Sequence, residues 1–132
     1  MTTIHANTPR DALRRLENMV SMAGLSIPVK AIREQISSAL DVLVQIGRMV
    51  GGRRKIVNIS EITGMEGDTV CLNDIFHYQQ KGVDSDGNAY GQFECCGVRP
   101  KLLEKLAASG VEFPVTMFQR RVMETVSDKN QE

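Results

Sequence analysis

The chain changes character at Asp41-Val42-Leu43-Val44-Gln45-Ile46, where β-branched residues replace the helical spacing of the preceding segment. Gly51-Gly52 follows within a few residues and is typical of a tight turn between strands. Together these features predict a strand over about 42–50, a turn, and a second strand over about 54–64. The alternative is that the helix before Asp41 continues to Met49, because a short apolar run suits either structure.

The pattern continues toward the C-terminus as further short strands. Val70 and Leu72 share one face of a third predicted strand, which begins at Thr69. Asp86-Gly87 is a strong hairpin signal, and Ala89 to Cys95 is the fourth predicted strand. The region over about 42–95 is therefore predicted to be an antiparallel β-meander.

Helices are predicted on both sides of this meander. Thr8-Pro9-Arg10-Asp11 has the residues of a helix start, which predicts a helix over about 9–23. A second start at Ser26-Ile27-Pro28 predicts a helix over about 28–40, so the two helices occupy about 9–40. Pro100 and Pro114 each precede a helical pattern within about 100–126, the second with Phe118, Val122 and Val126 four residues apart. The polar tail 127–132 is predicted to be frayed, so 1–126 form one unit of mixed α and β structure.

Composition places the chain among ordinary soluble domains. It has 132 residues, 42% of them hydrophobic, and 16 basic residues balance 16 acidic ones. A net charge of zero excludes a chain-wide basic footprint, and the local basic clusters are not interleaved with aromatic residues, so no nucleic-acid partner is predicted. The start of the sequence has no signal-peptide pattern, and the three cysteines are an odd number, which together predict a cytoplasmic protein with reduced thiols.

Common catalytic and metal-binding motifs do not occur in the chain. Cys95 and Cys96 are adjacent and poorly spaced for one ion, and Asp84-Ser85-Asp86-Gly87-Asn88 is too short for an EF-hand, so no metal site is predicted. The sequence has no G-x4-G-K-[S/T] phosphate loop, no G-x-S-x-G and no H-E-x-x-H. The chain therefore lacks the parts of a self-sufficient nucleotide hydrolase, serine hydrolase or zincin.

His5 is the remaining candidate for chemistry. It lies just before the predicted helix start, where free backbone N–H groups attract phosphate or other anions. The residues alone favour a structural histidine at a strand end over a catalytic one and leave both roles open.

A resemblance to a known family bears on this choice. Thr2-Thr3-Ile4-His5-Ala6-Asn7-Thr8-Pro9-Arg10-Asp11-Ala12-Leu13 resembles the His-box segment of type II/IV secretion ATPases, most of all the CpaF-like Flp/Tad pilus assembly ATPases. Glu61 to Asp68 resembles the E-x-x-G-M-E-G-D turn of that family, and Gly97-Val98-Arg99-Pro100 matches a later segment. The likeness extends over about 1–118.

The resemblance implies a fold and an activity. It implies the C-terminal portion of a RecA-like P-loop ATPase domain, with the His box at 2–12 and residues 1–5 in a strand. Intact members form hexamers that hydrolyse ATP with Mg²⁺ to power pilus assembly or secretion. Their Walker A and Walker B segments precede the His box, so this chain alone is predicted to be inactive and to bind no cofactor. Its nucleotide-binding residues are unknown.

The resemblance also implies roles for individual residues and for partners. His5 would face the γ-phosphate, and Arg10, Arg14, Arg15 and Arg33 would be candidates for contacts between subunits. The partners would be copies of the same ATPase and an inner-membrane platform protein, so that the cytoplasmic protein would lie peripherally at the inner membrane. The alternative is a free-standing, non-catalytic interaction module that binds or regulates secretion ATPase rings.

Overall fold

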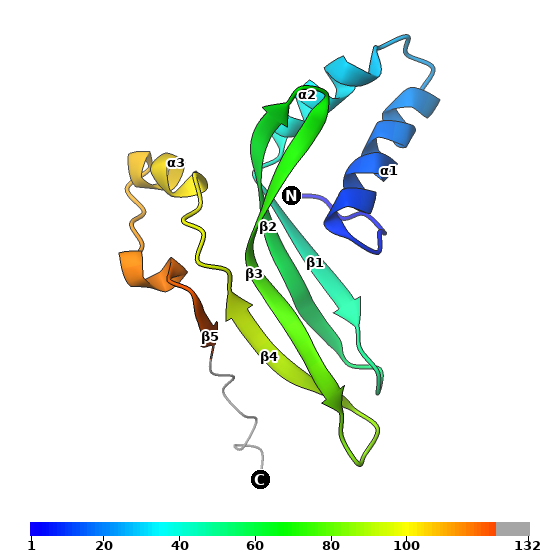
Figure 1. Ribbon diagram of the computed structural model, residues 1–132. Helices are drawn as coiled ribbons and strands as arrows, with labels where there is room; N and C mark the ends of the chain where they lie inside the picture. Colours follow the sequence, from blue (N-terminus) through cyan, green and yellow to red (C-terminus); the bar gives the residue numbers. More distant parts are fainter. Residues whose placement is uncertain (124–132) are drawn as a thin grey trace.

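The computed structural model describes residues 1–123, in which two helices, a long antiparallel sheet and a small C-terminal region follow one another (Figure 1). The helices come first, and most of the strands follow without interruption. The elements are α1 Pro9–Met22, α2 Val29–Ala39, β1 Val42–Arg48, β2 Arg54–Glu66, β3 Thr69–Val83, β4 Ala89–Cys95, α3 Leu102–Ala108, the 3-10 helix η1 Val115–Phe118, and β5 Arg121–Met123.

The sheet has five strands in the order β1-β2-β3-β4-β5, and every neighbouring pair is antiparallel. The prediction of a RecA-like domain, which is built on a parallel sheet, is therefore wrong for the described chain. The physical reason is the length of the connections: β1 to β4 are joined by short turns, whereas parallel neighbours need a crossover of a dozen or more residues. The helices lie before and after this run of strands rather than between them.

The strand predicted after Asp41 is confirmed, and the alternative of a continued helix is wrong. The backbone of Leu40 is already extended, with φ −108° and ψ 131°, so α2 ends at Ala39. β1 then pairs with β2 along its whole length, from Val42 opposite Glu61 to Arg48 opposite Arg54. The meander predicted over about 42–95 is observed as β1 to β4.

Over residues 114–123, the described part of the last predicted helix, no α-helix is formed. Pro114 precedes only one 3-10 turn, and Arg121–Met123 then form a strand against β4. Phe118 packs with Phe76 of β3 at a ring-centroid distance of 6.1 Å, which holds the turn against the sheet. This contact and the open edge of β4 outweigh the helical spacing of the apolar residues. Val126 and the predicted tail lie outside the described residues.

The N-terminal segment also differs from its prediction, because residues 1–6 form no strand. The segment is instead joined to the sheet by one side chain, since Gln45 Nε2 in β1 donates to the Ala6 carbonyl at 2.9 Å. The predicted strand at 1–5 is therefore wrong, and His5 lies in an irregular segment just ahead of α1.

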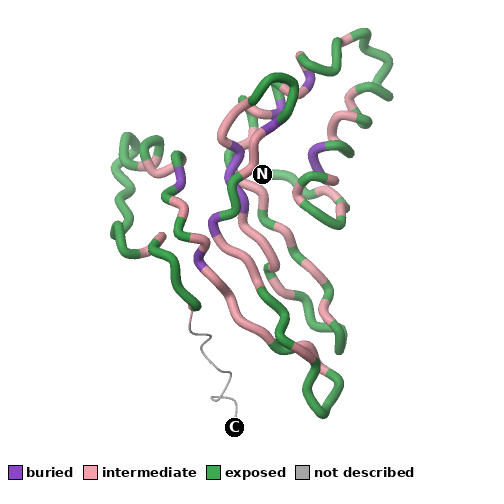
Figure 2. Tube along the Cα trace, in the orientation of Figure 1, coloured by how far each residue is buried: buried purple, intermediate pink, exposed green. Residues whose placement is uncertain are grey.

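The core lies between the two long helices and the end of the sheet near the β2–β3 turn (Figure 2). α1 and α2 each present an apolar stripe to this end of the sheet. The buried cluster consists of Leu13, Ile32, Ile36, Ile62 and Val70. The other end of the sheet extends beyond the helices, as Figure 1 shows, and carries more exposed residues.

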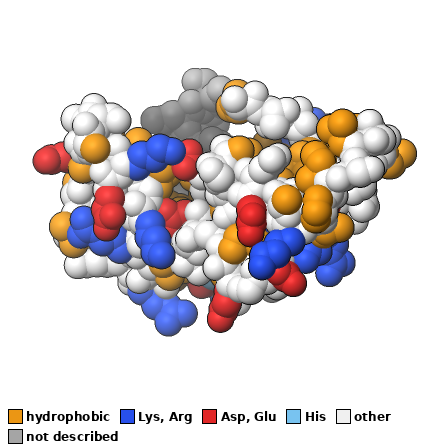
Figure 3. All heavy atoms as spheres, turned by 90° about the horizontal axis from the view of Figure 1, so that it is seen from above, with side chains coloured by type: hydrophobic (Ala, Val, Ile, Leu, Met, Phe, Trp, Pro, Cys, Tyr) orange, Lys and Arg blue, Asp and Glu red, His pale blue; other side chains and the backbone are white. Residues whose placement is uncertain are grey.

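Both charged and apolar side chains reach the surface. Basic and acidic side chains lie interspersed on the face seen from above in Figure 3. On β1 and β2, Val44, Ile46 and Ile56 are 52%, 59% and 45% exposed. Of the helices within residues 1–123, none combines the length and the apolarity needed to cross a bilayer.

Removing the cap of α1 is expected to weaken that helix. Thr8 Oγ1 accepts a hydrogen bond from the Asp11 N–H at 3.1 Å and donates to Asp11 Oδ2 at 2.8 Å. Thr8→Ala removes both bonds and should lower the free energy of unfolding by about 1 kcal/mol in urea denaturation. Thr2→Ala, an exposed threonine outside any helix or strand, is the control. Equal stability of the two variants would contradict this account.

Candidate functional site

A polar hollow of about 430 Å³ brings together three of the residues singled out in the sequence: His5, Arg14 and Arg15. His5 comes from the irregular segment before α1, and the two arginines from the middle of that helix. All three residues are exposed. The other residues of the hollow are Ala6, Asn7, Asp11 and Asn18.

Local sequence explains how these residues meet. Asp11, Arg14, Arg15 and Asn18 follow the three- and four-residue spacing that places side chains on one face of a helix. The cap at Thr8 fixes the start of α1, and the hydrogen bond from Gln45 to the Ala6 carbonyl ties the preceding segment to β1.

The charges of the hollow suit an anion. Arg14 and Arg15 contribute two fixed positive charges, and the imidazole of His5 is a further possible donor. Asp11 is the one acidic residue lining the hollow, and its carboxylate already accepts from Thr8 Oγ1. Guanidinium groups present several N–H donors in a planar fork that matches phosphate or carboxylate oxygens.

The other two predicted interface arginines lie elsewhere and make contacts within the chain. Arg10 Nη1 donates to the Val70 carbonyl of β3 at 3.0 Å. Arg33 Nε and Nη2 donate to both carboxylate oxygens of Glu17 at 2.8 and 3.2 Å, and its Nη1 donates to the Asp68 carbonyl at 2.9 Å. The hydrogen bonds and the charge of Glu17 raise the pKa of Arg33. Both residues join helices to their neighbours.

Sequence reasoning missed one member of the hollow and a buried acidic residue. Asn18 was not singled out, although its position seven residues after Asp11 predicts the same helix face. Glu61 was noted only as the first residue of a family motif. In the structure it is 2% exposed, and its carboxylate accepts from the backbone N–H groups of Lys101 and Leu102 at the start of α3.

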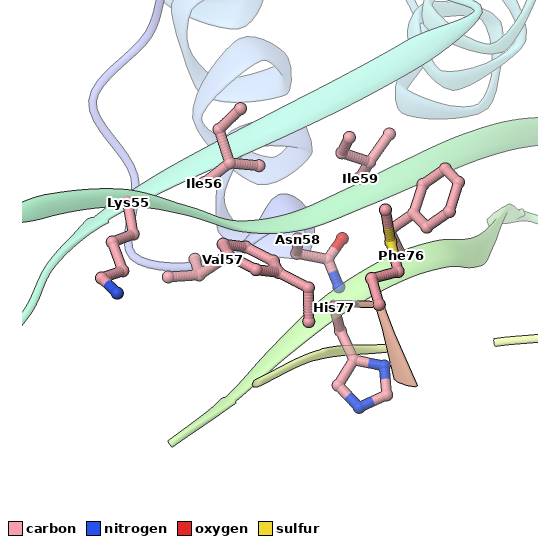
Figure 4. A pocket seen from close by; sticks show the side chains of 9 residues that line it. Lys55, Ile56, Val57, Asn58, Ile59, Phe76 and His77 are labelled. Carbon is pink, nitrogen blue, oxygen red and sulfur yellow. The ribbon is translucent and has the colours of Figure 1, made fainter. Parts of the chain in front are cut away.

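A second cavity, of about 440 Å³, lies on the sheet and is mainly apolar (Figure 4). Strands β2 to β5 all contribute to it, with Ile59, Phe76, Phe93 and Met123 among its apolar residues. Figure 4 shows the ring of His77 directed away from Ile56 and Ile59. Within residues 1–123, no three His, Cys, Asp or Glu side chains gather as they would around a metal ion.

Comparison with known proteins gives a partial similarity. No family model matches the chain. It is 36% identical over 85 residues to conjugal transfer protein TrbB of Rhizobium radiobacter, over 64% of this chain and 24% of TrbB. It is 29% identical over 87 residues to putative conjugal transfer proteins of two Mycobacterium tuberculosis strains, over 66% of this chain and 24% of each relative. The chain thus spans about a quarter of the length of these relatives.

Proposed function

We propose that this chain is the C-terminal portion of an ATPase that powers conjugal transfer, type II/IV secretion or the related Flp/Tad pilus assembly. The observation that carries the proposal is the hollow that unites His5 with Arg14 and Arg15. The similarity to conjugal transfer proteins and the His-box resemblance at 2–12 support it.

The hollow would act on the phosphates of ATP. His5 would donate to the γ-phosphate or sense its loss, and the two arginines would offset the charge that builds up there during transfer. The phosphate loop and the Mg²⁺ ligands carry much of the work in phosphoryl transfer, and this chain has no phosphate loop. They would belong to the part of the longer protein that this chain does not span, so the chain alone would be inactive.

The assembly follows from the same proposal. The intact ATPase would form a hexamer in the cytoplasm and meet an inner-membrane platform protein. Arg14 and Arg15 are exposed and available for contacts between subunits. Arg10 and Arg33 already bind groups of their own chain, so they would shape such an interface by holding α1 and α2 in place.

A second function is favoured by the exposed apolar residues of β1 and β2. Ile46 lies opposite Ile56 in the sheet, and Val44 is also exposed, so these side chains offer a surface for a protein partner. On this account the chain is a non-catalytic module that binds secretion ATPase rings. Three results together would favour this module over the first proposal. The chain would bind purified rings, Ile46→Lys would abolish that binding, and His5→Ala would leave the ATP turnover of the rings unchanged.

The decisive experiment measures Mg²⁺-dependent ATP turnover and nucleotide binding. The 132-residue chain is expected to show neither, whereas the longer protein should lose activity about tenfold to a hundredfold on His5→Ala. Arg14→Ala should also lower the turnover of the longer protein, because it removes one positive charge from the hollow. Arg53→Ala, which changes an exposed arginine in the β1–β2 turn, is its charge control. ATP turnover by the 132-residue chain that requires His5 would refute the proposal that the phosphate loop belongs to another part of a longer protein. Full activity of the longer His5→Ala protein would refute the role of His5.

A further inference from the structure

The three cysteines occupy three different environments, and one of them lies beside an imidazole. Cys96 Sγ is 3.2 Å from His77 Nδ1, and His77 Nε2 is 3.3 Å from Glu94 Oε2. Cys95 is buried, with its Sγ near the Met117 carbonyl, and Cys71 Sγ lies 4.0 Å from Glu66 Oε2. Only Cys96, among these three, has a base within hydrogen-bond distance that is itself oriented by a carboxylate.

The sheet register produces this alignment. His77 of β3 lies directly opposite Glu94 of β4, which places the imidazole and the carboxylate side by side. Cys96 is the first residue after β4, and its N–H donates to the Ile75 carbonyl at 2.9 Å. This bond holds the backbone of Cys96 against β3, so that its thiol lies next to the other ring nitrogen of His77.

The contact with Glu94 determines which ring nitrogen of His77 can accept the thiol proton. The hydrogen bond from Gln92 lowers the pKa of Glu94, so Glu94 is a carboxylate at neutral pH. A carboxylate accepts from Nε2–H, which leaves Nδ1 of a neutral ring as an acceptor. Nδ1 can then take the thiol proton, as the base does in activated nucleophile sites.

The groups around the thiol make such a base necessary. Burial raises the pKa of Cys96, and the negative charges of Asp74 and Glu94 and the neighbouring Cys95 act in the same direction. Arg120, which precedes β5, acts in the opposite direction. The free thiol is therefore mostly protonated at neutral pH, and proton transfer to His77 is the route to the reactive thiolate.

We propose that Cys96 is a site of thiol–disulfide exchange with a low-molecular-weight disulfide, with His77 as the base and Glu94 as the residue that orients it. Cys96 sulfur attacks one sulfur of the disulfide while His77 takes the thiol proton. A new S–S bond forms to Cys96, the old S–S bond breaks, and the leaving thiolate takes the proton from the imidazolium. Cys96 is oxidised, and half of the disulfide is reduced to a thiol.

The test incubates the 132-residue chain with oxidised glutathione from pH 6 to 9 and maps the modified cysteine by tandem mass spectrometry. Cys96 is expected to react first, and His77→Asn should slow its reaction at pH 7 about tenfold or more. The reaction rate of His77→Asn should also rise more steeply with pH, because without the imidazole base only hydroxide removes the thiol proton. Glu94→Gln should change both quantities in the same direction but less.

Gln80→Ala changes an exposed residue of the same strand and is the matched control, with an expected rate equal to that of the unaltered chain. A merely structural role of His77 would loosen the region and make Cys96 react faster in His77→Asn. That outcome, an unchanged pH profile, or faster modification of Cys71 would overturn the proposal. The proposal does not depend on the chain being part of an ATPase.

Discussion

Glu61→Ala is expected to lower the free energy of unfolding by about 3 kcal/mol, because it removes a buried carboxylate that accepts hydrogen bonds from two backbone N–H groups. Glu61 belongs to the middle of β2 and is 2% exposed. Its Oε2 accepts from the Lys101 N–H at 3.0 Å, and its Oε1 accepts from the Leu102 N–H. These bonds join the start of α3 to a strand 40 residues earlier in the chain.

Two measurements check this expectation. Urea denaturation gives the loss of stability, and amide hydrogen exchange at Lys101 and Leu102 reports whether α3 has separated from the sheet. Glu34→Ala, which removes an exposed carboxylate of α2, is the matched control and should change stability little. A loss in Glu61→Ala no larger than in the control, with both amides still protected, would show that another contact holds α3.

Ile32→Ala is expected to cost about 3–4 kcal/mol, the usual range for a fully buried aliphatic side chain cut back to a methyl group. Ile32 is 2% exposed and lies in the cluster where α1 and α2 meet β2 and β3. The cavity would weaken the packing of α1 and α2 against the sheet, so the helix pair and the sheet should lose stability together.

The control for Ile32→Ala comes from the same helix. Val29 lies in the first turn of α2 and is 49% exposed, so Val29→Ala should cost less than about 1 kcal/mol. Thermal and urea denaturation of both variants measure the difference. A similar loss in the two variants would mean that the buried cluster contributes less to stability than its burial indicates.

Local signals in the sequence predicted the first two helices and the strands β1 to β4 well. Thr8 and Pro9 act through neighbouring backbone atoms alone, and the observed α1 begins at Pro9. Gly51 and Gly52 both adopt positive φ, at 88° and 85°, in the turn that their spacing indicated. Such features depend on a few adjacent residues, so they can be read without knowledge of the rest of the fold.

The candidate site was predictable only in part. The helical spacing of Arg14 and Arg15 and the position of His5 before the cap bring them into one hollow. Arg10 and Arg33 were placed with them by resemblance, yet their partners Val70 and Glu17 lie 60 and 16 residues away. Which partner a long side chain reaches depends on how the helices pack, and this is not a local property.

The sequence by itself determined the first two helices, the four consecutive hairpin strands and the cap before α1, because each rests on short-range periodicity or turn chemistry. The tertiary structure alone decided that Arg121–Met123 pair with β4 instead of forming a helix, and that His77 meets Glu94 and Cys96. Each of these depends on the register and edges of strands brought together by folding. A shift in pairing between Gln80 and Gly82 is enough to change which side chains are opposite one another.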